Sequence, residues 1–239
     1  MGLSVPQARS LLPSTLSPAI IWGMNADVPQ SSIQGHLHRP AQPSGDCLIL
    51  THGAGANSDA PLLVALANAF SNAGITVLRF DLPFRQSRPH GPPPRGSAIR
   101  DQQGLREAVA SMRTQAPGRM FLGGHSYGGR QVSMLCAAEP GLVDCLLLLS
   151  YPLHPPLKRE ELRTAHFPDL KTPGLFVSGT RDGFGTIDEL TAALKLIPAR
   201  TELLPIASAG HELMTKKNRD ELPPLVVQAF LAFAARTQA

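Results

Sequence analysis

The sequence predicts an α/β protein built on a mostly parallel, doubly wound sheet with helices on both faces. Short, continuously apolar segments alternate with longer segments of helical periodicity. Strands with continuous apolar character are typical of parallel sheets that are covered on both faces. The length of 239 residues and the hydrophobic content of 43% fit a single domain of this class.

Six core strands are expected, at residues 46–53, 75–82, 119–124, 144–152, 172–180 and 200–206. The helices expected between and after them span residues 60–74, 96–118, 129–141, 187–197 and 222–237. Two earlier segments, 19–26 and 32–40, favour edge strands that could form a hairpin. Residues 1–17 are rich in Ser, Pro and Leu and are expected to be loosely ordered, which leaves 18–239 as the domain. The short connection between 152 and 172 predicts that no cap domain covers the sheet.

Composition narrows the possible partners and the compartment. The net charge is +4, without a basic run, so no nucleic-acid partner is expected. No apolar window is long enough to span a membrane, and no membrane partner is expected. The three cysteines, Cys47, Cys136 and Cys145, lie in separate apolar segments, which favours buried free thiols and a reducing compartment. We therefore expect a soluble, cytoplasmic protein.

A serine flanked by glycines follows the third core strand. Residues 124–128, Gly-His-Ser-Tyr-Gly, match the pattern G-x-S-x-G between an expected strand and an expected helix. In this setting the serine occupies a strained turn that projects its hydroxyl, and glycine allows the neighbouring backbone to approach closely. Ser126 is therefore the candidate nucleophile. The alternative is a glycine-rich turn that a serine merely caps.

A serine hydroxyl needs a base to become a good nucleophile. His211 follows the sixth core strand and Asp182 follows the fifth, and the carboxyl ends of parallel strands meet at one edge of a sheet. His211 is the candidate base and Asp182 the acid that orients it. The alternatives are a surface histidine and a turn-forming aspartate. Asp188 is a weaker candidate for the acid, and Asp81 is expected to be structural or to face the substrate.

Acyl transfer also needs hydrogen-bond donors for the developing oxyanion. The N–H of Tyr127, directly after the nucleophile, is one candidate, and the N–H of Ala54, after the first core strand, is the other. The alternative for residues 52–55 is a plain turn. A dinucleotide-binding loop is disfavoured because Ser58 stands where that motif needs its third glycine.

A long proline-rich segment, residues 81–96, carries Arg85, Arg88 and Arg95, and Arg130 lies one helical turn beyond the nucleophile. Arginine pairs with carboxylates through two parallel hydrogen bonds. These four arginines are candidate substrate-binding residues, and they predict a preference for small acyl substrates with a negative charge. The alternative is a solvated surface without specific contacts.

Several segments together carry a resemblance to a known family: LTHGAGANSD, LRFDLPF, FLGGHSYGGR, YPLHPP and VSGTRDGFGT. Over residues 45–215 the chain resembles the α/β-hydrolase superfamily, in its small lid-less branch near dienelactone-hydrolase-like proteins. It resembles most closely a subgroup with bacterial hydrolase-like proteins and a subunit of the non-specific lethal histone-acetyltransferase complex. The resemblance implies Ser126 as nucleophile, Asp182 as acid and His211 as base. Dienelactone hydrolases proper have a nucleophilic cysteine, so their substrate is not implied.

These residues predict a serine hydrolase that cleaves a carboxylic ester or thioester through an acyl-serine intermediate. No metal and no cofactor are expected, and the expected partner is a small-molecule acyl substrate. The oligomeric state is left open. The rival hypothesis is a non-catalytic interaction module on the same fold, because a fold does not determine a function.

Overall fold

The computed structural model of this chain describes residues 1–2 and 35–237, and residues 35–237 belong to one compact unit. The loosely ordered segment expected at residues 1–17, apart from its first two residues, lies outside the described part of the chain. The edge strand expected at 19–26 and the domain boundary expected at residue 18 lie outside it as well.

The described residues form a seven-stranded sheet with the order β1-β3-β2-β4-β5-β6-β7. The strands are β1 (Gly35–His38), β2 (Cys47–Thr51), β3 (Thr76–Phe80), β4 (Met120–His125), β5 (Cys145–Leu149), β6 (Gly174–Gly179) and β7 (Thr201–Ile206). Five of the neighbouring pairs are parallel, and only β1 pairs antiparallel, with β3. The predicted sheet class is confirmed, and five of the six core strands lie within the ranges expected from sequence, while β4 extends one residue beyond its range, to His125.

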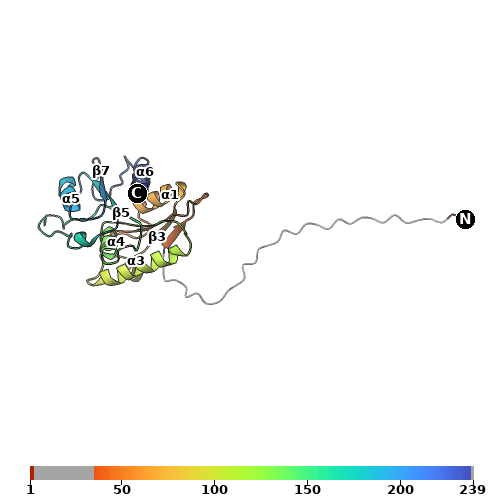
Figure 1. Cartoon of the computed structure of the whole chain (residues 1–239), viewed down its shortest axis with the longest axis horizontal. Coiled ribbons are helices and arrows are strands. Elements are labelled where there is room, and N and C mark those ends of the chain that lie inside the picture. The colour runs from red at the N-terminus through yellow and green to blue at the C-terminus, as the bar shows by residue number, and fades with distance from the viewer. Residues whose placement is uncertain (3–34, 238–239) are drawn as a thin grey trace. The chain divides into compact units, whose positions relative to one another are not determined.

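Helices cover both faces of this sheet, as Figure 1 shows for α1 and α6 on one side and α3 and α4 on the other. The helices are α1 (Pro61–Asn72), α2 (Pro83–Ser87), α3 (Ser97–Arg113), α4 (Tyr127–Ala138), α5 (Ile187–Leu194) and α6 (Leu222–Ala235). Residues of α5 belong to the same core cluster as those of α3 and α4. Every residue of β2 to β6 is buried, which explains why these segments lack a polar alternation.

Two connections determine how open the functional edge of the sheet is. Between β5 and β6 the chain forms only a short 3-10 helix, Phe167–Asp169, and no cap domain is present, as expected. The proline-rich segment after β3 was expected to be a loop, but its first part is the short helix α2. Pro83 at the first position of α2 explains this helix start, because proline fixes a helical φ and lacks the N–H that a helix start leaves unused.

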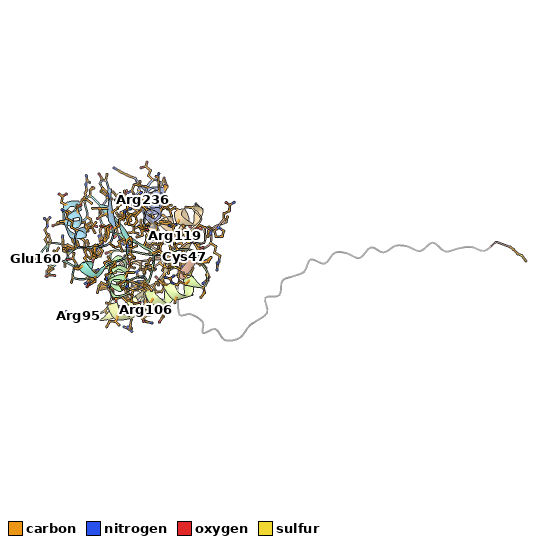
Figure 2. The ribbon with its side chains drawn as sticks, viewed as in Figure 1. Cys47, Arg95, Arg106, Arg119, Glu160 and Arg236 are labelled. Carbon is orange, nitrogen blue, oxygen red and sulfur yellow. The ribbon has the colours of Figure 1, made fainter. Side chains whose placement is uncertain are left out.

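The three cysteines are free and buried, which confirms the expectation from sequence. Burial raises the pKa of the Cys47 thiol and of the Cys136 thiol to about 12, and it also raises the pKa of Cys145. Figure 2 places Cys47 inside the packed body of the domain. Across the described residues, no helix combines the length and the apolar character that crossing a bilayer requires.

Candidate active site

Ser126 occupies a sharp turn between β4 and α4. Its backbone has φ 51° and ψ −116°, in a region that non-glycine residues rarely adopt, and its N–H donates to the carbonyl of Leu149 over 2.8 Å. A Cβ atom on Gly124 would lie 2.6 Å from the backbone of Gly128 and Gly129. The glycines therefore allow the start of the helix to cross close to the strand, which leaves the serine side chain projecting from the bend.

The structure brings Ser126, His211 and Asp182 together at the carboxyl edge of the sheet. Nε2 of His211 lies 2.8 Å from Oγ of Ser126, and Nδ1 lies 2.9 Å and 3.0 Å from the two carboxylate oxygens of Asp182. A carboxylate only accepts, so Nδ1 carries the hydrogen of the neutral ring. Nε2 is then the acceptor for the serine hydroxyl. This is the arrangement that a serine nucleophile, a base and an orienting acid require.

Two aromatic rings hold His211 in place. The ring of Phe184 lies 4.1 Å from that of His211 at an angle of 31°, and Phe184 donates its N–H to Asp182 over 2.9 Å. On the other side, Nε2 of His125 donates to the carbonyl of His211 over 2.9 Å. Burial lowers the pKa of His125, which keeps this imidazole neutral. Neither role was expected from the sequence, although His125 lies within the serine motif.

The expected oxyanion donors, Tyr127 and Ala54, belong to the start of α4 and to the turn after β2. Tyr127 is the first residue of α4, where an N–H has no acceptor within the helix. Its hydroxyl donates to Asp101 over 2.7 Å, which anchors this end of the helix to α3. Ala54 belongs to a tight turn in which the N–H of Ala56 donates to Gly53 over 3.2 Å. A cavity of about 390 Å³ is bordered by residues 53–56, the serine and the histidine.

Arg85 differs from the substrate contact expected of it. The side chain is buried in α2, and its guanidinium donates to four backbone carbonyls at 2.7 Å to 3.0 Å. These carbonyls belong to Ala54, Ala56, Arg88 and Gly91. The side chain thus ties the turn after β2 to the proline-rich segment. Four of its five N–H groups are used in this way, so the guanidinium is committed to backbone and not to a bound carboxylate.

The other three arginines are not brought together around the serine. Arg88 and Arg95 are exposed, and Figure 2 shows Arg95 at the edge of the domain. Arg130 is half-buried in α4, and no described residue accepts a hydrogen bond from its Nε. The cavity that contains Ser126 is bordered by none of the three.

Neither of the other two candidate aspartates, Asp81 and Asp188, contacts His211. Asp81 accepts the N–H of Ser58 over 2.6 Å, in agreement with a structural role. Asp188 is exposed in the first turn of α5 and lies outside the contact with His211, which Asp182 makes. Within residues 1–2 and 35–237, no cluster of three His, Cys, Asp or Glu side chains is arranged to hold a metal ion.

The comparisons with known proteins agree with this architecture. A family model described as an alpha/beta hydrolase domain matches residues 44–236, which is most of the chain. The narrower subgroup expected from the sequence stays a prediction.

Solved structures of other proteins share the fold at low identity. A dienelactone hydrolase from Anabaena variabilis is 20% identical, with a TM-score of 0.67, over 87% of this chain and 94% of that one. An alpha-beta serine hydrolase homologue from Coxiella burnetii is 17% identical, with a TM-score of 0.68, over 85% and 94%. Est1E from Butyrivibrio proteoclasticus, solved with ferulic acid bound, is 17% identical, with a TM-score of 0.67, over 85% and 96%.

Proposed function

Because this chain belongs to the alpha/beta hydrolase domain family, we propose that it is a serine hydrolase that cleaves a carboxylic ester or thioester through an acyl-serine intermediate. The observation that carries the proposal is the continuous contact from Asp182 through His211 to Ser126, with 2.8 Å between Nε2 and Oγ. The structural similarity to Est1E and to a serine hydrolase homologue supports the same class of chemistry.

In the proposed reaction, Oγ of Ser126 attacks the carbonyl carbon of the substrate while Nε2 of His211 takes the hydroxyl proton. The oxyanion that forms accepts hydrogen bonds from the N–H groups of Tyr127 and Ala54. When the tetrahedral intermediate collapses, the bond to the leaving oxygen or sulfur breaks and His211 returns the proton to it. Water then repeats the sequence on the acyl-serine, which releases the acid and restores the serine.

Asp182 contributes by orientation and charge. It keeps the hydrogen on Nδ1, so that Nε2 is free to accept, and it stabilises the imidazolium that forms during the reaction. Its side chain is almost fully buried, which keeps competing water away from this contact. Arg85 supports the oxyanion contact indirectly, because it binds the carbonyl of Ala54 and so holds the turn that carries the Ala54 N–H.

The experiment that tests this proposal is labelling with a fluorophosphonate, followed by peptide mass spectrometry. The label is expected on Ser126 in stoichiometric amount and is expected to disappear in Ser126→Ala. Ser150 is a matched control, because it follows β5 with a similar φ of 46°, while no described residue hydrogen-bonds its buried hydroxyl. Folded protein that takes up no label, or takes it up on Ser150, would support the interaction-module hypothesis instead.

A further inference from the structure

A second cavity lies beside the one that contains Ser126. It has a volume of about 240 Å³ and is formed between the start of α1 and the residues after β7. Gly53, Ala56, His125 and Glu212 border both cavities, so the two are neighbours that share one wall. A substrate whose carbonyl meets Ser126 therefore has a second space within reach.

The wall of the second cavity is mainly aliphatic. Its α1 side consists of Ala60, Pro61, Leu62 and Leu63, and Met214 closes the side formed after β7. Aliphatic walls favour apolar groups, because these leave water on binding and gain close contacts.

The polar side chains of this wall are largely occupied. His52 is fully buried, with Nδ1 2.9 Å from the carbonyl of Gly53 and Nε2 3.1 Å from the N–H of Leu82. Nε2 of His125 is engaged with the carbonyl of His211. Neither histidine therefore has a free N–H to offer to a group in the cavity, and His125 adds at most one acceptor.

Among the described residues, the only charged side chain in the wall of the second cavity is acidic. Glu212 is exposed on the wall that the two cavities share, and the lining contains neither lysine nor arginine. A carboxylate placed here would face a like charge and lose its hydration without gaining a partner. This electrostatic environment opposes the anionic substrate that the four arginines had suggested.

From these observations we propose that the second cavity is a substrate subsite for a short, neutral aliphatic group attached to the scissile carbonyl. The inference rests on the proposed hydrolase function, and it specifies the substrate class for that site. The volume is about eight times the roughly 30 Å³ that one water molecule occupies in the liquid, which suits a short chain or a small ring.

The kinetic experiment varies chain length on one side of the ester at a time. One series lengthens the acyl group from acetate to hexanoate, and the other lengthens the alcohol of acetate esters from methyl to hexyl. In one of the series kcat/KM should rise about threefold to fourfold for each added methylene until the cavity is full. A chain of the same length that ends in a carboxylate should react at least tenfold more slowly.

Two variants test the location of the subsite. Ala60→Phe fills the cavity while keeping the backbone contact at the start of α1, where the carbonyl of Ala60 accepts from Val64. It should abolish the gain with chain length, so that the ratio of kcat/KM between the longest and the shortest ester falls to near one. Met214→Trp serves the same purpose if Ala60→Phe does not fold. A gain with chain length that both folded variants retain would overturn the subsite.

A third variant tests the charge. Glu212→Gln should reduce the disadvantage of the carboxylate-tipped ester at least threefold. Glu160→Gln is the matched control, because Glu160 is exposed at the edge of the domain in Figure 2 and borders neither cavity. Equal effects of the two substitutions would contradict a role for Glu212.

A binding measurement separates this inference from the proposed function. In the full-length protein, the ¹³C-methyl NMR signal of Met214, assigned with Met214→Leu, should shift saturably with 1-hexanol. A shift without hydrolysis of any ester would leave the subsite standing and reject the proposed function. Hydrolysis without a chain-length preference and without an NMR shift would reject the subsite alone. If hydrolysis, chain-length preference and NMR shift are all absent, both the subsite and the proposed function are rejected.

Discussion

Two histidine–aspartate pairs lie at the same edge of the sheet, and their hydrogen bonds differ. Nε2 of His52 accepts the N–H of Leu82 and therefore carries no hydrogen, so the carboxylate of Asp81, 3.5 Å away, gains no hydrogen bond from it. In the other pair, Nδ1 of His211 donates to Asp182 and leaves Nε2 facing Ser126. The chemical role that a histidine can take is thus determined by which groups hydrogen-bond its two nitrogens.

The two histidines also differ in how deeply they are buried. His52 is fully buried, and backbone groups satisfy both of its nitrogens, so it ties the end of β2 to the end of β3. The side chain of His211 retains 19% of its exposure, and the cavity beside it is open to a substrate. The first pair is expected to support stability, and the second is expected to support turnover.

The largest expected effect comes from removing each histidine in turn. His211→Ala should reduce kcat for a short ester by roughly 10⁶-fold, as in another serine hydrolase triad, and leave the melting temperature nearly unchanged. His52→Ala leaves the N–H of Leu82 unpaired, whereas the carbonyl of Gly53 still accepts from Ala56, so the free energy of unfolding should fall by about 1–3 kcal/mol. Steady-state kinetics and thermal unfolding of both variants provide the comparison. A folded His211→Ala variant with near-normal turnover would remove the distinction.

The two aspartates give the next effect in size. Asp182→Asn presents an amide to Nδ1, which favours the wrong tautomer, and kcat should fall by about 10⁴-fold. Asp81→Asn still accepts the N–H of Ser58 and should change kcat by less than about tenfold. The measurement is kcat for the same ester in both folded variants. Similar losses in the two would indicate that proximity to a histidine, and not the hydrogen-bond pattern, decides the role.

Arg85 extends the comparison to a buried cation whose N–H groups donate hydrogen bonds to backbone carbonyls. Arg85→Lys cannot reach four carbonyls, so the free energy of unfolding should fall by at least about 2 kcal/mol. Because the turn that carries Ala54 loses its support, kcat should fall about tenfold or more, with KM less affected. The exposed Arg88 is the control, and Arg88→Lys should change stability by no more than about 0.5 kcal/mol. A preference for anionic esters that Arg85→Lys abolishes would instead restore the substrate contact expected from sequence.

The smallest expected effect is the pH dependence of stability. Burial lowers the pKa of His52 and that of His125, and it lowers the pKa of His166 to about 4. The unfolded chain takes up protons below about pH 6.5 that these buried rings exclude. Stability should therefore be fully retained above pH 6.5 and decrease as the pH falls from 6.5 towards 4.

Denaturant unfolding at a series of pH values measures this slope, to which each such ring adds up to about 1.4 kcal/mol per pH unit. His166→Phe should make the slope shallower, whereas the same change at the exposed His90 serves as the control. A slope that is unchanged in His166→Phe would show that this ring is not kept neutral by the fold.

Much of this fold and of the candidate site could be anticipated from local patterns. Continuous apolar segments marked the core strands, and the glycines around Ser126 marked the bend. Contacts between distant segments were not accessible in the same way. Nothing in the sequence around Arg85 indicates that its guanidinium would bond the carbonyl of Ala54, 31 positions away. A pattern identifies which residue types are present, whereas their partners depend on how the loops fold over the sheet.

The burial of the three cysteines has a practical consequence for handling the protein. Cys47, Cys136 and Cys145 are at most 1% exposed, and their pKa values are raised, so the reactive thiolate is scarce in the folded state. A thiol-reactive dye added to the native protein should therefore react only as the domain opens, and its rate of uptake reports that opening. A cysteine introduced at an exposed position such as Glu160 would carry a single fluorophore without removal of any native sulfur.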